Sequence, residues 1–120
     1  MAEHNQLGKS GEELAAKYLK EKGYRVLDRN YRFKGSEVDL FCEFDNQLVV
    51  VEVKTRQSSY LAGPEETVSI SKQRSIIKVT NQYIMEREID WECRFDIVSV
   101  ILNSKELKID HLEDAFYPTF

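Results

Sequence analysis

Two acids and a lysine, Asp39, Glu52 and Lys54, stand on two neighbouring apolar segments in the middle of the chain. The segments, residues 37–44 and 47–54, are rich in Val, Leu and Phe, as is typical of β-strands. Carboxylate oxygens bind Mg²⁺ well, and a cation held in this way polarises a phosphodiester and lowers the pKa of a bound water. A lysine two residues from an acid can position that water or stabilise developing charge. The residue types are therefore compatible with metal-assisted phosphodiester hydrolysis.

The short link between the two segments determines which residues face each other. Residues 45–46 are Asp and Asn, which tolerate the positive φ of a two-residue hairpin turn. With that turn, Asp39 lies opposite Glu52, and Glu37 lies opposite Lys54. All four side chains then share one face of the hairpin. Like charges directly opposed on two strands destabilise the pair, so this arrangement needs a physical explanation.

Several explanations remain open on the residue pattern alone. A divalent cation can lie between the two carboxylates, they can share a proton, or a nearby Arg or Lys can balance their charge. The cluster can also lack any catalytic function. It would then be a solvated group of charges, or an ion pair of Lys54 with Glu37 or Asp39.

A helix is expected over residues 5–22, upstream of the hairpin. Its apolar residues recur with helical periodicity, Asn5 is a candidate N-cap, and Gly23 is a stop signal. Glu12 lies at the margin of the apolar face. It is therefore either half-buried against a sheet or an acid favoured near the helix N-terminus by the helix dipole.

A second helix is expected over residues 71–86, capped by Ser69 or Ser71. Lys72 would lie in its first turn, where the dipole disfavours a cation, which suggests another role for this side chain. Further strands are expected over residues 24–33, 94–102 and 107–111, with a bend near 28–30 and an aromatic tail, 115–120, that packs down. The order α-β-β-β-α-β-β predicts an α/β fold with a mixed central sheet flanked by helices, in a single domain spanning residues 1–120.

Composition limits the function in several ways. The net charge of −4 and the pI of about 5.3 argue against a nucleic-acid binder. However, residues 1–36 hold eight Lys or Arg against five Asp or Glu, and residues 85–120 hold four against nine. This asymmetry suits either one binding face or a mixed solvated surface. No apolar run approaches the roughly 20 residues that span a bilayer, and the N-terminus lacks a signal-peptide pattern. We therefore expect a cytoplasmic protein with no membrane partner, and Cys42 and Cys93 as reduced core residues.

Short motifs stand in order along nearly the whole chain. They are Gly8-x-x-Gly11-Glu12, Gly35-x-Glu37-Val38-Asp39-Leu40, Val51-Glu52-Val53-Lys54-Thr55-Arg56, Gly63-Pro64, Lys72 and Arg94-Phe95-Asp96-Ile97-Val98. Together they resemble the YraN-like family of small bacterial proteins. That family is similar to archaeal Holliday junction resolvases of the PD-(D/E)XK nuclease superfamily, which has a restriction-endonuclease-like fold. One departure is Ser36, which stands where the family usually has glycine.

The resemblance implies Glu12, Asp39 and Glu52 as acids of a Mg²⁺ or Mn²⁺ site, Lys54 as the catalytic amine, and the Val53 carbonyl as a further metal ligand. It implies a metal-dependent endonuclease that acts on DNA, with branched DNA such as Holliday junctions as a candidate substrate and a homodimer as one candidate assembly. Fold analogy alone does not establish cleavage. The alternative is a non-catalytic nucleic-acid-binding or protein-interaction module with the same fold.

Acids attract phosphate only through a cation, so binding energy for DNA must come from basic residues around them. The candidates for this basic rim are Lys9, Arg32, Lys34, Arg56 and Lys72. Contacts of this kind position a nucleic acid without reading its sequence.

Overall fold

The computed structural model describes residues 2–58 and 68–117, and for residues 2–7 it describes the backbone alone. The elements are α1 (Ala2–Glu21), β1 (Arg25–Phe33), β2 (Ser36–Phe44), β3 (Gln47–Arg56), α2 (Ile70–Arg87), β4 (Glu92–Leu102) and β5 (Leu107–Phe116). This order confirms the predicted succession of helices and strands.

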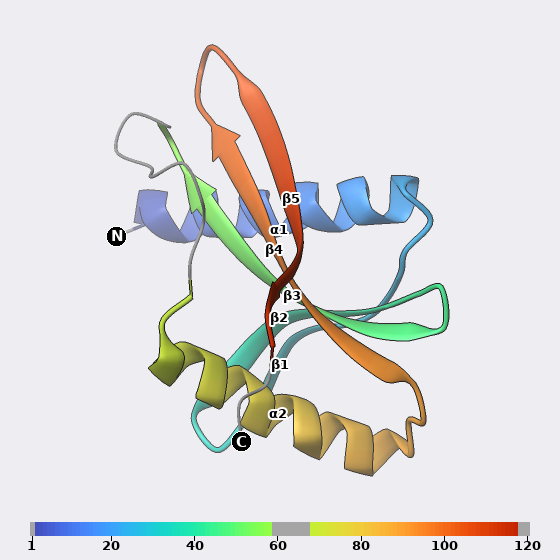
Figure 1. Cartoon of the computed structure of the whole chain (residues 1–120). Helices are drawn as coiled ribbons and strands as arrows, with labels where there is room; N and C mark the ends of the chain where they lie inside the picture. The colour runs from blue at the N-terminus through green and yellow to red at the C-terminus, as the bar shows by residue number, and fades with distance from the viewer. Residues whose placement is uncertain (1, 59–67, 118–120) are drawn as a thin grey trace.

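The strands form one mixed sheet in the order β1-β2-β3-β4-β5, with one helix on each face (Figure 1). Neighbouring strands are antiparallel except for β3 and β4, which are parallel and are connected through α2. A parallel pair requires such a crossover connection, whereas the antiparallel pairs need only short turns. The predicted α/β architecture is therefore confirmed.

Two apolar clusters hold the helices against the sheet. The cluster on the α1 face contains Ala15, Leu19, Tyr24, Leu40, Cys42, Val49, Val51, Val98 and Val100. The cluster on the α2 face contains Val38, Phe41, Leu48, Val50, Ile76, Val79, Tyr83 and Phe95. Along β3, successive residues alternate between the two clusters, so this strand is buried on both faces. The site described below lies where this strand leaves its neighbour.

Two tight turns fix the register of the first three strands. Asp45 and Asn46 have φ values of 52° and 61°, as the predicted two-residue turn requires. Lys34 and Gly35 form the second turn, with φ values of 48° and 81°. The expected loop before the hairpin is thus a tight turn, and the glycine that precedes Ser36 supplies its left-handed conformation.

The ends of the helices correct one prediction and confirm two. Helix α1 begins at Ala2, so Asn5 lies inside the helix and the predicted N-cap is wrong. Gly23, at φ 96°, ends the helix as expected, with its N–H bonded to the Lys20 carbonyl. Ser69 caps α2 by accepting a hydrogen bond from the Lys72 N–H at 3.2 Å.

The C-terminal part of the chain differs from the prediction. Strand β5 continues past the predicted end to Phe116, and Asp114 at φ 50° marks an irregularity in its pairing with β4. The Phe116 ring packs on Phe95 with centroids 4.9 Å apart, whereas Tyr117 is 70% exposed, so only part of the tail packs down. Cys93 is exposed, which contradicts its predicted place in the core.

The Gly63-Pro64 motif and residues 118–120 lie outside the described residues. Both cysteines are free thiols, as expected. Across residues 2–58 and 68–117, neither helix is long and apolar enough to cross a membrane.

Candidate functional site

The paired strands β2 and β3 separate in the middle of the sheet. Their pairing runs from the turn to Leu40 and Val51, as the predicted register requires, and stops there. Beyond this point the β1–β2 turn and the end of β3 lie far apart in Figure 1. Asp39 and Glu52 are the first residues past the last pair. We call this opening between β2 and β3 the fork.

The Asp39 side chain closes the base of the fork. Its Oδ2 accepts a hydrogen bond from the Val53 backbone N–H at 2.8 Å. A buried N–H without a partner is costly, and here a carboxylate replaces the missing strand partner. In an antiparallel pair, the N–H and C=O of one residue point to the same neighbouring strand. The Val53 carbonyl is therefore expected to face the fork as well.

Glu52 and Asp39 form a buried pair of acids, with relative exposures of 8% and 9%. Burial, a hydrogen bond with the Asp39 carboxyl group and the Asp39 charge raise the pKa of Glu52 to about 8. The predicted convergence of these two side chains is confirmed. Two acids this close cannot both ionise without a balancing positive charge, so the pair either keeps a proton or needs a cation beside it.

Two lysines approach the acid pair. Lys72, in the first turn of α2, places its Nζ 3.9 Å from Glu52 Oε1. The positive charges of Lys72 and Lys54 both lower the pKa of Glu52. The contact with Glu52 explains why a cation is tolerated where the helix dipole disfavours it. Lys72 therefore belongs to the fork itself, in addition to its predicted place in the basic rim.

Glu12 reaches the region from α1, and Gly11 allows that approach. A Cβ added to Gly11 would lie 2.0 Å from Thr55 Oγ1 on β3, so only glycine fits between the helix and the strand. Glycine inside a helix is otherwise unfavourable by about 1 kcal/mol. Glu12 lies in the middle of α1, and the helix dipole acts only within the first turn. The dipole explanation for Glu12 is therefore wrong.

Glu12 is half-buried beside Asp39, on the side of the fork away from Lys72. Burial raises the pKa of Glu12, hydrogen bonds from Asn30 lower it, and the charges of Asp39 and Glu37 raise it. Within residues 2–58 and 68–117, no three acidic, histidine or cysteine side chains converge as a ready-made metal site. Asp39 and Glu52 thus form the close pair, and Glu12 stands next to it.

Glu37 does not share a face with Glu52, which corrects the predicted arrangement. Val38 packs in the cluster on the α2 face, whereas Leu40 packs on the α1 face, so the strict alternation of β2 breaks between them. Glu37, next to Val38, therefore points to the α1 side, where its charge acts on Glu12. The pairing with Lys54 is absent, because the strands have already separated.

Asn30 is a polar residue near the site that the sequence reasoning missed. It lies inside β1 with φ 50°, and its side-chain Nδ2 is 3.2 Å from both carboxylate oxygens of Glu12. Asn is disfavoured in strands and tolerates the left-handed conformation, so its occurrence within an otherwise regular strand was an available signal. The expected bend near residues 28–30 is consistent with this irregularity.

Two residues of the basic rim lie at the β1–β2 turn. Arg32 donates from Nε to Glu37 Oε1 at 3.1 Å, and 78% of its side chain is exposed. Lys34 occupies the turn itself, with its Nζ 5.3 Å from the centroid of the Phe33 ring. Both side chains are therefore at the surface, close in sequence to Asp39.

The remaining rim residues, Lys9 and Arg56, are close in sequence to Gly11 and Thr55, where α1 approaches β3. Lys9 is exposed on α1, and Arg56 is the half-buried last residue of β3. The structure therefore places the predicted basic residues on the elements that surround the fork. Whether they contact DNA stays a prediction.

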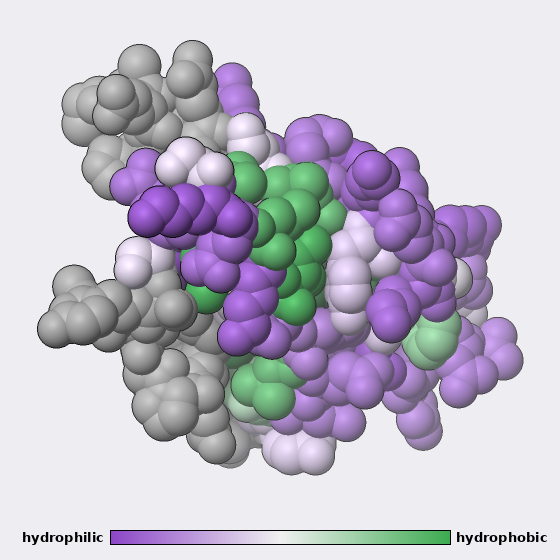
Figure 2. Space-filling view, turned by 90° about the horizontal axis from the view of Figure 1, so that it is seen from above, coloured by the Kyte–Doolittle hydropathy of each residue, from purple (hydrophilic) through white to green (hydrophobic). Residues whose placement is uncertain are grey.

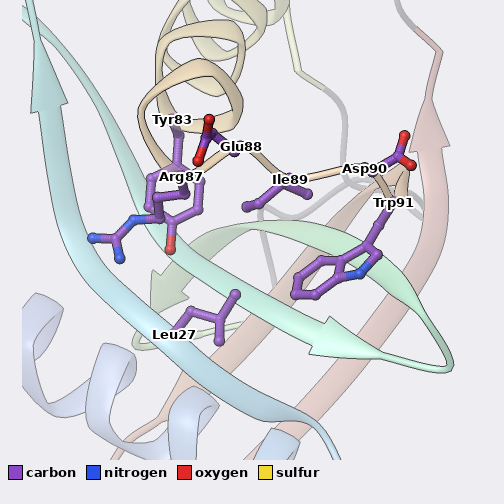
Figure 3. A pocket seen from close by; sticks show the side chains of 7 residues that line it. All are labelled: Leu27, Tyr83, Arg87, Glu88, Ile89, Asp90 and Trp91. Carbon is purple, nitrogen blue, oxygen red and sulfur yellow. The ribbon is translucent and has the colours of Figure 1, made fainter.

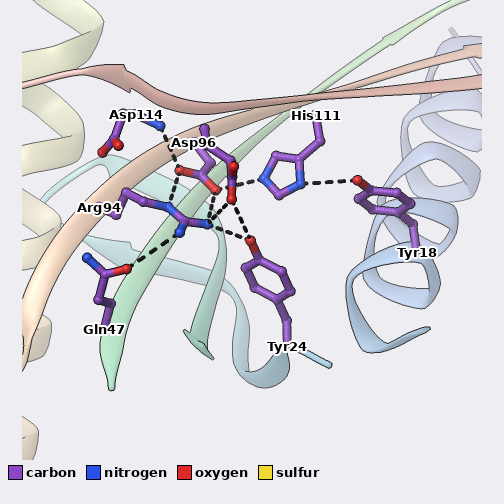
Figure 4. A network of polar contacts seen from close by, with 8 residues as sticks. Tyr18, Tyr24, Gln47, Arg94, Asp96, His111 and Asp114 are labelled. Carbon is purple, nitrogen blue, oxygen red and sulfur yellow. Dashed lines mark hydrogen bonds and ion pairs between the residues drawn. The ribbon is translucent and has the colours of Figure 1, made fainter. Parts of the chain in front are cut away.

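A second buried charge cluster lies on the α1 face, away from the fork (Figure 4). Arg94 donates to both Asp96 oxygens at 2.9 and 2.8 Å, and the imidazole of His111 is 2.7 Å from Asp96 Oδ2. The Asp114 N–H donates to the other oxygen at 3.2 Å, and the Tyr18 hydroxyl lies 3.2 Å from His111 Nδ1. The sequence offered a signal in Arg94-Phe95-Asp96, where the two charged residues share one face of a strand.

Two pockets open away from the fork. One lies at the end of α2 and is lined by Leu27, Tyr83, Arg87, Glu88, Ile89, Asp90 and Trp91 (Figure 3). The other borders the second charge cluster and is lined by Tyr18, Lys22, Tyr24, Phe44, His111 and Glu113. None of the residues predicted for catalysis or metal binding lines either of them.

Apolar side chains also reach the surface. Figure 2 shows a patch of apolar residues bordered by hydrophilic ones, on the side seen from above Figure 1. Large apolar side chains that are exposed in the described chain are Ile70, Met85, Leu107, Leu112 and Tyr117. Such surface is suited to protein contacts, so a protein-interaction module stays open as an alternative.

The structure defines an α/β protein with a five-stranded mixed sheet and two buried carboxylates where two strands separate. The chain belongs to the uncharacterised protein family UPF0102, whose profile matches residues 11–100. A UPF0102 protein of Flavobacterium johnsoniae is 48% identical over 121 residues, and one of Flavobacterium psychrophilum is 45% identical over 117, each covering 98% of both chains. A UPF0102 protein of Alkaliphilus oremlandii is 44% identical over 116 residues, with 94% of this chain and 99% of the relative covered. The family resemblance is confirmed, and the similarity to nucleases stays a prediction.

Proposed function

We propose that the protein is a Mg²⁺- or Mn²⁺-dependent endonuclease that hydrolyses phosphodiester bonds in DNA. The observation that carries the proposal is the buried pair of Asp39 and Glu52 at the fork, with the amines of Lys54 and Lys72 beside it. Among the described residues, the ion pair of Lys72 with Glu52 is long, at 3.9 Å, so it balances the two acids only weakly.

The donor set at the fork fits a divalent cation. Mg²⁺ prefers carboxylate and carbonyl oxygens, and it keeps several water ligands, so two acids are sufficient protein ligands. Asp39 and Glu52 would hold the cation, with the Val53 carbonyl as a further oxygen donor. When bound, the cation supplies Lewis-acid activation of water and neutralises charge on the phosphodiester. Its charge would offset the burial and the neighbouring Asp39 that raise the pKa of Glu52.

The other side chains have roles that follow from their charge. Lys54 is the amine that positions water or stabilises negative charge on the reacting phosphate. Lys72, in contact with Glu52, provides a second positive charge on the same side. Glu12, on the opposite side of Asp39, adds negative charge near the cation. A four-way junction needs two symmetric cuts, so a homodimer is part of this proposal for branched substrates.

Cleavage of linear, flapped and four-way DNA in Mg²⁺ or Mn²⁺ tests the proposal. We expect Glu52→Gln to abolish cleavage, because it removes one of the two buried carboxylates. Glu106→Gln, which changes an exposed acid in the β4–β5 turn, is the matched control and should cut like the wild type. Failure of the wild type to cut any of these substrates with either cation would overturn the proposal.

DNA binding is expected to depend on the basic rim. We expect the triple variant Arg32→Glu, Lys34→Glu and Arg56→Glu to lose binding to all DNA sequences alike. The net charge of −4 predicts weak affinity with a shallow salt dependence.

The control for this test places the same charge change elsewhere. A triple variant at Lys17, Lys20 and Lys22 changes three exposed lysines towards the far end of α1, and it should bind more nearly like the wild type. Equal DNA binding by the rim variant and the wild type would favour the alternative function, a protein-interaction module. The exposed apolar side chains are the observation that supports that alternative.

A further inference from the structure

The backbone of β1 is irregular directly opposite Asp39. The pairing joins Arg29 to Leu40 and Tyr31 to Val38, and it omits the intermediate pair of Asn30 and Asp39. Asn30 has φ 50°, a left-handed conformation that a strand residue rarely adopts. The irregular residue of β1 and the acid at the base of the fork therefore face each other. Strain of this kind tends to be retained where the surrounding structure uses it.

The side chain of Asn30 uses this conformation to reach across to α1. Its Nδ2 donates to both oxygens of Glu12, each at 3.2 Å, so one amide nitrogen orients the whole carboxylate. Because of this left-handed backbone, the Asn30 side chain does not follow the regular alternation of side chains between the two faces of β1. The side chain connects the first strand to the middle of the first helix, beside Asp39.

The group that holds Glu12 is neutral, although a cation is available nearby. Arg29, one residue before Asn30, forms its ion pair with Glu13 rather than with Glu12. A guanidinium paired to Glu12 would neutralise its charge, whereas an amide orients the carboxylate and leaves the charge in place. Glu12 thus remains an oriented negative group next to the acid pair.

We propose that Asn30 is a positioning residue that aims the Glu12 carboxylate at the cation bound by Asp39 and Glu52. This inference rests on the proposed metal site. Because no third acidic, histidine or cysteine side chain converges with the acid pair among the described residues, Glu12 would act through the waters that Mg²⁺ retains. Hydrogen-bond partners of this outer kind orient the groups around a metal and tune its affinity.

Titration calorimetry of the whole chain with Mn²⁺, without DNA, tests the inference. Asn30→Gly keeps the left-handed conformation available and removes the side chain that carries the amide. We expect its Mn²⁺ affinity to fall roughly tenfold or more, as for other outer partners of metal ligands. Asn46→Gly is the matched control, because Asn46 has a similar φ of 61° in the β2–β3 turn and lies outside the fork. It should bind Mn²⁺ like the wild type.

A double-mutant cycle separates positioning from a general structural effect. If Asn30 acts through Glu12, then Asn30→Gly should cause no further loss of Mn²⁺ affinity in a Glu12→Gln background. Unchanged affinity in Asn30→Gly, together with weaker binding in Glu12→Gln, would overturn the role of Asn30 and leave the metal site intact. Absence of Mn²⁺ binding by the wild type would instead overturn the proposed function itself.

Discussion

Two buried carboxylates, Asp96 and Glu52, stand in opposite electrostatic surroundings. Burial raises the pKa of Asp96, but the hydrogen bonds from His111 and Arg94, the Arg94 charge and the Asp114 N–H together bring it below its usual value. Burial raises the pKa of Glu52 as well, and its acidic neighbour raises it further, to about 8. Similar burial therefore leads to opposite results, because the partners differ.

The difference shows which of the two clusters has its hydrogen bonds and charges balanced within the chain, and we call such a cluster complete. Every oxygen of Asp96 is bonded to a donor within the chain, and a guanidinium balances its charge. Glu52 faces another acid, and its lysine contact is long. We infer that the Asp96 cluster is a structural element of the fold, whereas the acid pair at the fork is left to hold a proton or to bind a positive charge from outside the chain.

The largest effect is expected from breaking the complete cluster. Arg94→Met leaves Asp96 as a buried charge without its main partner, and removal of one member of a buried pair typically destabilises a protein by about 3–5 kcal/mol. Urea denaturation should show a fall of this size in the free energy of unfolding. The control is Arg25→Met, which removes an exposed ion pair with Glu43 and should cost about 0–1 kcal/mol. Equal effects of the two changes would contradict the contrast.

The stability that the fork contributes should change with pH in the opposite direction to that of the Asp96 cluster, because the pKa of Glu52 is raised and the pKa of Asp96 is lowered. The pKa of Glu52 is raised from 4.5 to about 8. The contribution of Glu52 to the free energy of unfolding is therefore fully present below pH 4.5, and it is lost as the pH rises through 8. In EDTA, the free energy of unfolding should therefore fall as the pH rises from about 4.5 to about 8. Glu52→Gln should remove that part of the fall. Identical pH profiles for variant and wild type would show that the pKa of Glu52 is not raised.

Divalent cations should stabilise the fork by binding the folded state. At about 100 times the dissociation constant, mass action adds about 2.7 kcal/mol. Differential scanning fluorimetry at pH 8 should show a rise in melting temperature with millimolar Mg²⁺ or Mn²⁺, reduced in Asp39→Asn. A buffer of matched ionic strength without divalent cations is the control for simple salt effects. An unchanged melting temperature with either cation would indicate that the acid pair does not bind metal.

The smallest effects distinguish two glycines of α1. Gly11→Ala places a methyl group against Thr55, so it should destabilise the protein by about 1–3 kcal/mol. Gly8→Ala meets no atom within 4 Å and should stabilise the helix by about 0.5–1 kcal/mol. Thermal unfolding of the two variants measures the difference. Shifts of the same sign would disprove the close approach of α1 to β3.

The local pattern of the sequence was sufficient to predict the elements and the acid pair. Alternating apolar residues and the Asp45-Asn46 turn determine the β2–β3 register, and this register brings Asp39 to Glu52. The position of Glu37 could not be predicted, because the packing of Val38 on the α2 face, which breaks the alternation of β2, is a long-range contact. The role of Asn30 depends on a left-handed backbone conformation, which cannot be predicted from the alternation of apolar and polar residues along a strand.

The Asp96 cluster was beyond local reasoning for a different reason. Its members come from β4 and β5 together with Tyr18 of α1, so they meet only in the folded chain. The full length of β5 was missed because Asp114 interrupts its alternation with a left-handed residue. Long-range contacts and irregular backbone thus account for most of the differences.

The order in which the chain can assemble follows from the turn between β2 and β3. A hairpin closed by two residues forms within about 1–10 μs, whereas a parallel strand pair must first close a long loop. Asp39 and Glu52 lie on that hairpin, and Lys72 lies in the connection between the parallel strands β3 and β4. The two acids can therefore meet before the lysine arrives. The charge state of the two acids therefore matters on the folding route, before the Lys72 charge is in place.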